Sequence, residues 1–508
     1  QVEGNERANL EGKAATYQLG YDSQREPDLT INEGWNNDNR TWIQEGTNQR
    51  IVLDTFFSAV QPEQSLVFFY AKRTPLSDNP RRVIVGVGRV RSVSQPVEYC
   101  YVNGTPPPGR IRGYLWERNV EHSIMPEGDD GFLLPYEKLL ARSDDEDSLD
   151  LDSCTAFAPD EYFEQYSYGT ELLPQDGAIA SLLALEKSIE AMRDLVERDL
   201  VDAPLDTYLQ WIDTELNRLW QARGAFPGLG AALHAFGLPL GNLLAWHLLA
   251  DQNEWENPWE RFSQTLEEPG SLPGYLSQGI GDTIRRKWEN LPDESRALLE
   301  LLARFNLSNE QARRWYHEQE RTNAGINLNV PDILDNPYRI YEEDRYQSNP
   351  IAFSVIDRGM FPPQALRVAC PLPERSQVQE AIDPRRVRAA MVQTLEEAAT
   401  EGHTLLPENW MIDRVCKRPM QPECSLDANT IPIIHPCLLP LIHTVDLGAH
   451  GRAFQLDRYN STANLIQMEV SARINGQQNG EEFNWEGLVE QAIDGGFGDQ
   501  HLGENEES

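Results

Sequence analysis

The stretch DPRRVRAAMVQTLEEAATEGHTLLP, residues 383–407, predicts a helix that is bounded at both ends. Asp383 is a typical N-cap, and Pro384 fits the first helical position. Gly402 stands where helices commonly end in a left-handed cap. Between these ends, apolar residues at helical spacing predict a buried stripe: Val387, Met391, Leu395 and Ala398. The following HTLLPENWMIDRVC predicts a short extended segment and another helix, a winged-helix-like arrangement.

Two short glycine turns precede this helix and share the outline of a helix-hairpin-helix. They are PGLGAALHAFG at 227–237, with Gly228 and Gly230, and QGIGDTIRRKW at 278–288, with Gly279 and Gly281. Each turn follows one predicted helix and opens another, so the free backbone amides of the new helix can seat an anion. Such turns hold a nucleic-acid phosphate without reading a base.

Three basic residues follow the second turn, Arg285, Arg286 and Lys287, and they stand out in an acidic chain. Together with Gly279 and Gly281 they predict a contact with the DNA backbone. The alternative for both turns is a glycine-rich helix junction that only packs. No basic residue follows GLG at 228–230, which favours packing there.

Strand signals gather in the first third of the chain. SLVFFYAK at 65–72, RRVIVGVGRVRSV at 81–93, PVEYCYV at 96–102 and GYLWERNV at 113–120 are separated by Pro, Gly, Asp and Asn. The first two resemble strands of PUA and EVE barrels, which border a pocket for a flipped, modified base. That resemblance implies a base pocket of Trp42, Phe69, Tyr70 and Lys72. The alternative treats the aromatic residues as ordinary strand residues.

The sequence predicts an α+β multidomain protein with a β-rich domain, PUA/EVE-like, followed by mainly α-helical helix-hairpin-helix and winged-helix-like domains. The predicted parts are a polar arm (1–46), a β-rich α+β domain (47–142), an acidic linker (143–171), a helical domain with helix-hairpin-helix-like units (172–325), a helical, winged-helix-like domain (326–415), a small α/β segment (416–475) and an acidic tail or lead-in to a motor (476–508). The charge-free stretch 225–250 predicts two short buried helices, because Pro227, Pro239 and several glycines interrupt it. In FNLSNEQ, Ser308 and Gln311 predict a capping box.

Composition limits the classes of function. The 508 residues carry 81 acidic and 44 basic side chains, a formal net charge of −37, which leaves only a local basic surface for nucleic acid. Six Cys without regular spacing predict a reducing, cytoplasmic compartment. The chain begins with Gln1 and has no signal-peptide pattern, which predicts a processed product or a fragment of a longer protein.

Motifs for catalysis and metal binding are missing from the sequence. G-x-x-x-x-G-K-[ST] is absent, so the chain alone is not expected to hydrolyse ATP. G-x-S-x-G is absent as well. Cys416, Cys424, His435 and Cys437 lie close together in sequence but lack a close Cys pair, and we expect buried thiols there and no metal site.

Several segments, in order, resemble the N-terminal, non-motor region of RecD-like ATP-dependent DNA helicases, superfamily-one motors that move 5′ to 3′; large bacterial proteins with this region are also described as AAA family ATPases. They are GIG at 279–281, FNLSNEQARRWY at 305–316, NPYRI at 336–340, EEAATEGHTLLP at 396–407 and RAFQLDRYNSTANLI at 452–466. The chain departs from the family after NPYRI, where EEDRYQSNPIAFSVIDRG keeps only a trace of the usual motif.

The resemblance implies a DNA-binding accessory region that grips the backbone of a single strand or fork beside a motor, in DNA repair or anti-phage defence. ATP and Mg²⁺ would belong to that motor, in cis or as a separate subunit. No cofactor is expected in this chain, and no membrane partner. Two alternatives stay open: a non-enzymatic subunit that contacts a separate ATPase, and a protein that reads modified bases.

Overall fold

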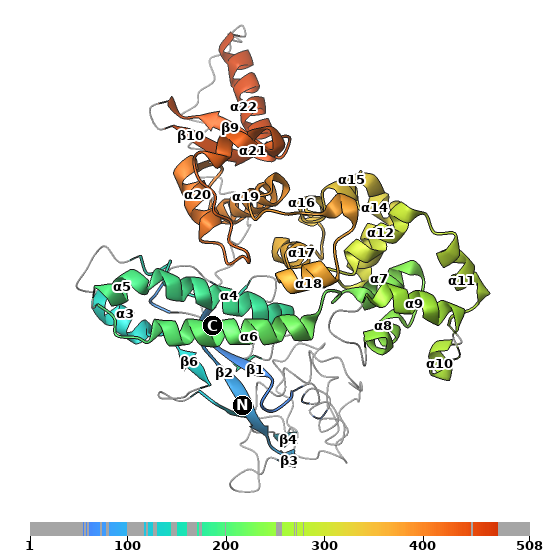
Figure 1. Ribbon diagram of the computed structural model, residues 1–508. Coiled ribbons are helices and arrows are strands. Elements are labelled where there is room, and N and C mark those ends of the chain that lie inside the picture. The colour runs from blue at the N-terminus through green and yellow to red at the C-terminus, as the bar shows by residue number, and fades with distance from the viewer. Residues whose placement is uncertain are drawn as a thin grey trace, which may run out of the picture.

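The computed structural model describes Asp54, Phe57 and residues 60–71, 74–77, 81–98, 116–117, 120–124, 130–143, 150–159, 170–171, 175–198, 200–249, 257–268, 270, 272–277, 279–448 and 451–475. The fold is mixed α+β, as predicted, with small antiparallel sheets and a majority of helices (Figure 1). Trp42 and Lys72 of the predicted base pocket, the polar arm and the tail after Asn475 lie outside the described residues.

The N-terminal part is built on an antiparallel sheet of order β5-β2-β1-β7, with β6 also paired to β2. Its strands are β1 (Leu66–Ala71), β2 (Val83–Val93), β5 (Val120–His122), β6 (Gly131–Leu133) and β7 (Thr170–Glu171); β3 (Val97–Glu98) and β4 (Trp116–Glu117) form a separate pair. Side chains alternate along β1. Leu66, Phe68 and Tyr70 belong to the large hydrophobic cluster on one face of the sheet, whereas Val67 and Phe69 belong to a small separate cluster on the other face.

Two long helices, α4 (Gln175–Ala191) and α6 (Leu205–Arg223), lie side by side across this sheet (Figure 1). Phe132 of β6 stacks on Tyr208 of α6 at a centroid distance of 4.4 Å. We call the resulting cluster the first core. It also includes residues of α3 (Tyr136–Ser143), α5 (Arg193–Glu197), α7 (Leu229–Phe236), α8 (Gly241–Leu249), α9 (Pro258–Glu267) and α11 (Asp282–Glu289).

A second core is formed by helices further along the chain. It draws on α12 (Asp293–Leu302), α13 (Asn309–Tyr316), α15 (Val330–Asp335), α16 (Arg339–Asp344), α17 (Phe353–Met360), α19 (Pro384–Thr400), α20 (Glu408–Cys416) and α21 (Thr430–Leu438). The other helices in the described residues are α10 (Gly274–Ser277), α14 (Glu318–Asn323), α18 (Gln364–Ala369), a 3₁₀ turn at Glu374–Ser376 and α22 (Asp457–Asn475). Helix α7 lies between the cores, because Leu233 faces the first and Ala231 faces the second.

The helix predicted from 383–407 is present as α19. Asp383 accepts a hydrogen bond from the backbone N–H of Arg385 at 2.9 Å, and Gly402 has φ +92°. All four residues of the predicted stripe are buried. The predicted capping box is also present, because Ser308 and Gln311 exchange both hydrogen bonds. These features were predictable because each depends on neighbouring residues in the sequence.

Helix α19 opens a compact unit of helices and strands. It is followed by β8 (Leu406–Pro407), α20, α21 and the hairpin of β9 (Ile442–Asp446) and β10 (Arg452–Leu456). The strand order is β8-β10-β9, with Leu406 opposite Phe454. Side chains from Val387 to Leu456 share the second core. The boundary predicted at 415/416 therefore falls inside one packed unit.

The linker predicted at 143–171 also differs from the structure. Cys154, Ala156 and Ala158 are buried in the first core, Ile84 donates its backbone N–H to the carbonyl of Ala156 at 2.8 Å, and β7 pairs with β1. The acidic residues before Cys154 predicted a solvent-exposed linker, whereas the small apolar residues after them pack against the sheet.

The charge-free stretch 225–250 forms the two short helices α7 and α8, as predicted. Helix α7 is buried nearly all round, whereas α8 leaves Leu243 and Trp246 exposed. Within the described ranges, no helix has both the length and the apolar character needed to cross a bilayer.

Candidate nucleic-acid interface

The glycine turn at 279–281 is open to solvent. Gly279 and Gly281 are exposed, and Gly281 is the N-cap of α11 with an extended backbone (φ −91°, ψ 175°). A Cβ placed on Gly281 would meet no atom within 4 Å, and one on Gly279 would make only an ordinary contact at 3.4 Å. Neither residue adopts a positive φ. Nothing in the described surroundings therefore requires glycine here, and the space above the turn is free for a close approach.

The three cations after this turn are not equivalent. Arg285 donates from Nε to the carbonyl of Leu266 at 2.8 Å, and its Nη1 lies 3.7 Å from Asp282. Lys287 donates to the carbonyl of Phe236 and lies over the ring of the same residue at 4.6 Å. Burial lowers the pKa of Lys287. Two of the three predicted cations are therefore engaged with the protein itself.

Arg286 differs from the other two cations because its guanidinium has no partner among the described residues. The residue is also exposed. Asp282 occupies the first position of α11, where a negative charge competes with an incoming phosphate. Gly279 and Ile280 donate their backbone N–H groups to the carbonyls of Leu276 and Ser277, at 3.0 and 3.1 Å. The interface offered to an anion thus consists of Arg286 and the backbone at the start of α11, and it is smaller than the sequence suggested.

The first glycine turn is filled by the protein. A Cβ on Gly228 would lie 1.9 Å from the carbonyl oxygen of Phe305, and one on Gly230 would lie 2.2 Å from Oδ1 of Asn242. The N–H of Gly228 donates to the carbonyl of Ala303 at 3.0 Å. These glycines let α7 approach α8 and the end of α12, which is the packing role left open above.

Phe69 and Tyr70 of the predicted base pocket point to opposite faces of the sheet. Phe69 packs edge-on against His122 at a centroid distance of 4.8 Å, whereas Tyr70 lies beside Arg82 on the first core. Gly86 of the neighbouring strand β2 packs against β6, since a Cβ on Gly86 would lie 2.6 Å from the carbonyl oxygen of Phe132. The described residues therefore do not bring these two rings into one pocket.

The Arg-rich start of α19 is used inside the protein. Arg386 forms two hydrogen bonds with Asp357, at 2.7 and 2.8 Å, and Arg388 does the same with Glu342, at 2.8 and 2.6 Å. Burial raises the pKa of Glu342 although Arg388 opposes that shift. These arginines fasten α19 to α16 and α17 and are not available to a ligand.

The four residues weighed as a metal site serve separate purposes. Cys416 donates to the carbonyl of Leu426, Cys424 is buried, and His435 contacts Thr444 at 3.2 Å. Cys437 is exposed. No group of His, Cys, Asp and Glu in the described part of the chain could hold a metal ion.

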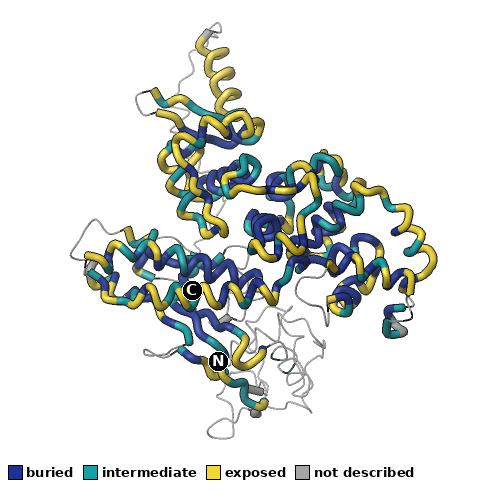
Figure 2. Tube along the Cα trace, in the orientation of Figure 1, coloured by how far each residue is buried: buried dark blue, intermediate teal, exposed yellow. Residues whose placement is uncertain are grey.

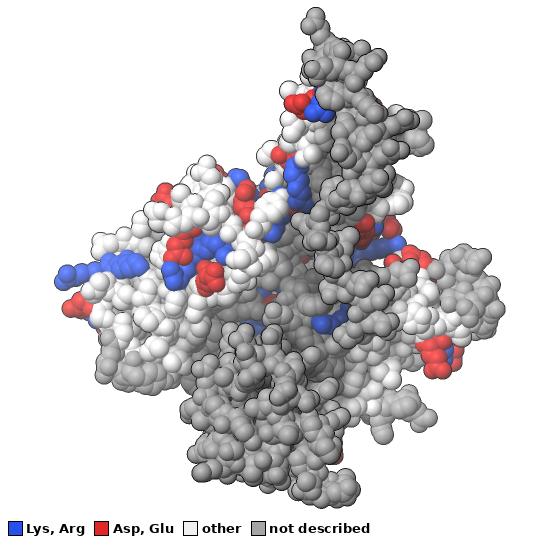
Figure 3. Space-filling view, turned by 180° about the vertical axis from the view of Figure 1, so that it is seen from behind, with Lys and Arg blue, Asp and Glu red and all other residues white. Residues whose placement is uncertain are grey.

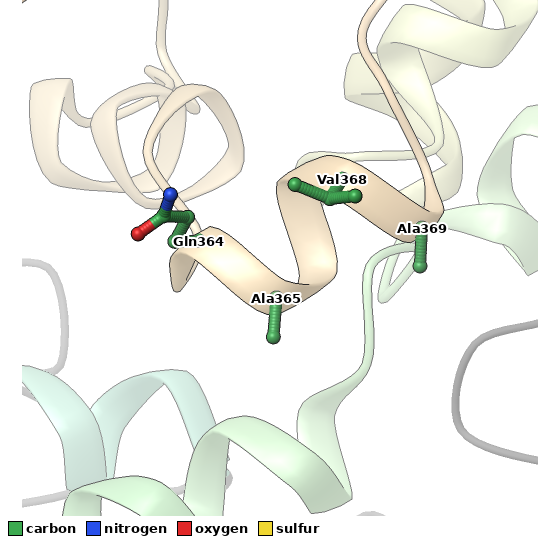
Figure 4. Close-up of a pocket in the computed structure, with 4 residues that line it drawn as sticks. All are labelled: Gln364, Ala365, Val368 and Ala369. Atoms are coloured by element: carbon green, nitrogen blue, oxygen red, sulfur yellow. The ribbon is translucent and has the colours of Figure 1, made fainter.

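The surface seen from behind carries Lys and Arg next to Asp and Glu, without a continuous basic area among the described residues (Figure 3). A hollow of about 620 Å³ lies beside α18 and is lined by Gln364, Ala365, Val368 and Ala369 (Figure 4). The described side chains that line this hollow include no titratable group.

A buried charge cluster between the cores was not predicted. Asp176 at the start of α4 accepts from Arg223 of α6 and from Arg358 of α17. Arg304 is 2% exposed and donates to the carbonyls of Cys370 and Pro371, while its Nε and Nη1 have no acceptor within the described residues. No local pattern marks such residues, because their partners are distant in sequence.

Comparison with known proteins finds no matching family model, no matching curated protein and no matching solved structure.

Proposed function

We propose that this chain is the non-motor, DNA-contacting region of a RecD-like 5′–3′ DNA helicase, acting beside an ATP-hydrolysing motor. The observation that carries the proposal is the open turn at Gly279–Gly281 with the exposed Arg286 one helical turn away. Glycine at an uncrowded position suits the close approach of a phosphate to the backbone. The order of the sequence segments that resemble this helicase region supplies the second support.

The unit from α19 to β10 supports the same proposal. Its order of helix, strand, helix, helix and hairpin, and its strand order β8-β10-β9, resemble those of winged-helix domains. Such units commonly place a helix or a hairpin loop against nucleic acid. In this chain α21 carries no Lys or Arg, so it is suited to positioning or to protein contacts more than to gripping phosphates.

The test is a fluorescence-anisotropy titration of labelled single-stranded and forked DNA over a series of salt concentrations. Arg286→Glu should weaken binding at low salt and reduce the slope of log affinity against log salt by about 0.7 on single strands, one phosphate contact. Gly281→Val should also weaken binding, because its side chain fits the fold but fills the space above the turn. Arg473→Glu is the matched control, an equal charge change at another exposed arginine.

Two results would discard the DNA-contacting role. One is the absence of binding at low salt by the unmodified chain. The other is an equal loss of affinity in the Arg286→Glu and Arg473→Glu variants, since that would indicate general electrostatic attraction without a site at the turn.

A second candidate function is a non-enzymatic subunit that contacts a separate ATPase. It is favoured by the apolar character of two exposed helical surfaces: Ile433 on α21 is 74% exposed and Trp246 on α8 is 66% exposed. Sequencing the gene beyond codon 508 separates the candidates. A downstream P-loop in the same reading frame supports the helicase region, and a stop codon beside a separate ATPase gene supports the subunit.

A further inference from the structure

A row of alternating arginine and tyrosine side chains lies where the first turn of α22 meets the end of α16. Its members are Arg345, Tyr346, Arg458 and Tyr459. The guanidinium of Arg345 lies over the Tyr346 ring, 4.2 Å from the centroid, and that of Arg458 lies 5.8 Å from this centroid and 4.8 Å from the centroid of Tyr459. Beyond this point α22 projects away from the described chain and is exposed (Figures 1 and 2). The row therefore joins segments that are 112 residues apart in sequence.

The ring of Tyr346 is exposed but held in place. The residue is 61% exposed, and its hydroxyl accepts hydrogen bonds from Arg345 at 2.8 Å and from Arg458 at 2.9 Å. Both arginines also donate to Glu396 of α19, at 2.9 Å from Arg345 and 2.6 Å from Arg458. The polar end of the tyrosine is thus fixed while its ring remains in solvent. A side chain that is already ordered loses little freedom when a flat group stacks on it.

The charges around this ring are positive on balance. Arg345 and Arg458 carry two positive charges against the one negative charge of Glu396, in a chain with a formal net charge of −37. Burial alone would raise the pKa of Glu396, but the two arginines hold that pKa below its usual range. Asp457, the neighbour of Arg458, contacts His443 at 2.8 Å. The row is therefore a small surface that attracts an anion beside an exposed aromatic ring.

The residues that follow the ring are polar. They are Gln347, Ser348 and Asn349, and the last two are exposed. An apolar protein partner is selected by a continuous apolar surface, which this segment does not provide. An exposed ring beside guanidiniums suits a single nucleic-acid strand, because a base can stack on the ring while the cations attract the backbone. Every base has an aromatic face, so such a site is tolerant of sequence.

We propose that Tyr346, backed by Arg345 and Arg458, is a stacking site for an unpaired base of single-stranded DNA. This site rests on the DNA-contacting function proposed above and deepens it, because it adds a contact with a base to the contact with the backbone at Gly281. Tyr346 lies in EEDRYQSNPIAFSVIDRG, where the chain departs from the helicase family, so the resemblance assigns it no role.

Anisotropy titration of the full chain with a labelled single strand tests the site. Tyr346→Ala should weaken binding by about 5- to 150-fold, the range expected when one stacked base is lost. The slope of log affinity against log salt should stay unchanged, because stacking on an uncharged ring releases no counterions. Arg286→Glu should reduce that slope, so the two contacts are separated by one measurement. Affinity for a blunt duplex should not respond to Tyr346→Ala, because its bases are already paired and stacked.

Three controls accompany this variant. Tyr346→Phe keeps the ring and should retain most of the affinity. Trp246→Ala removes another exposed ring, 66% exposed on α8, and should leave strand binding unchanged. A strand of equal length without bases presents the same phosphates, and Tyr346→Ala and the unmodified chain should bind it equally. Circular dichroism of each variant checks that the fold is kept.

Photochemical cross-linking locates the contact directly. A strand that carries iodouracil should cross-link to Tyr346, identified by mass spectrometry of the linked peptide. Unchanged affinity of Tyr346→Ala for the single strand, an equal loss on the strand without bases, or an equal loss in Trp246→Ala would each overturn the stacking site. In any of these cases Arg286→Glu can still weaken binding, so the stacking site can fail while the DNA-contacting role stands. Absence of strand binding by the unmodified chain would remove both.

Discussion

Asp176 accepts hydrogen bonds from both Arg223 and Arg358 on the same oxygen, at 2.6 and 3.0 Å. Arg223 belongs to α6 in the N-terminal part, and Arg358 belongs to α17, whose neighbours form the second core. The side chains of Asp176 and Arg223 are 2% and 1% exposed. One carboxylate therefore joins two parts of the protein that are 182 residues apart in sequence.

Replacing Asp176 by Asn should strongly destabilise the protein. The change removes the negative charge that Arg223 and Arg358 share in a buried site, and breaking a buried pair from one side costs about 3–5 kcal/mol. Urea unfolding followed by circular dichroism measures the loss. Asp335→Asn, which removes an exposed partner of Arg375, is the control and should change the midpoint little. Equal effects of both changes would mean that Asp176 does not couple the cores.

The effect of Asp176→Asn should depend on pH. Burial alone would raise the pKa of Asp176, but Arg223 and Arg358 outweigh burial and hold that pKa below its usual range. A depressed carboxyl pKa gives stability that is present above the unfolded value of about 3.9 and is lost as pH falls through the folded value. The difference in unfolding free energy between the unmodified protein and the variant should be constant near neutrality and shrink below about pH 4. A difference that grows on acidification would contradict the ion pairs.

The two glycine turns should respond differently to alanine. Gly228→Ala should lower the unfolding free energy, because its Cβ would lie 1.9 Å from a backbone oxygen that cannot move away easily. Gly281→Ala should have little effect, because its Cβ would enter open space at an allowed φ. Thermal unfolding of both variants measures the contrast. A large loss in Gly281→Ala would mean that this turn is packed in solution.

Two fully buried arginines should differ in what they contribute. Arg386→Met leaves Asp357 buried without its cation and should cost about 3–5 kcal/mol. Arg304→Met should cost less, because Arg304 hydrogen-bonds only backbone carbonyls and burial lowers its pKa to about 10. Urea unfolding of the two variants gives the comparison. A greater cost for Arg304→Met would point to an acidic partner outside the described residues.

The cysteines should react in an order set by burial. Burial raises the pKa of Cys154 and of Cys424 to about 11, so both thiols stay protonated at pH 8. Among the described cysteines, Cys437 is exposed and should be alkylated first by iodoacetamide, with Cys154 and Cys424 reacting only after unfolding. Mass spectrometry of the modified peptides gives the order. Protection of Cys437 that is lost with a chelator would instead reveal a metal site.

The sequence predicted the features that depend on neighbouring residues. The caps of α19, its buried stripe and the box of Ser308 and Gln311 are all local, and all are present. The mixed α+β composition followed from the change in periodicity after the first third of the chain.

Features that depend on distant residues were not predictable in this way. The turns GLG at 228–230 and GIG at 279–281 are nearly identical in sequence. Only the structure shows that the backbone of Phe305 packs against Gly228, whereas a Cβ on Gly281 would meet no atom within 4 Å. From the sequence, Arg285, Arg286 and Lys287 were treated as equivalent. In the structure, Arg285 and Lys287 donate hydrogen bonds to the backbone carbonyls of Leu266 and Phe236. The role of Asp176 also required the fold, since nothing near it in sequence pairs with it.

The pairing of Leu406 with Phe454 has a practical consequence for anyone who shortens this protein. An expression fragment that stops after α20 would lose β10, the central strand of the β8-β10-β9 sheet. The buried apolar side chains of α19 and α20 would then be exposed to water. Such a fragment should be insoluble, while one that runs through Leu456 keeps the three strands together. A C-terminal truncation should therefore end within α22, whose residues 461–474 are exposed and do not belong to the packed unit.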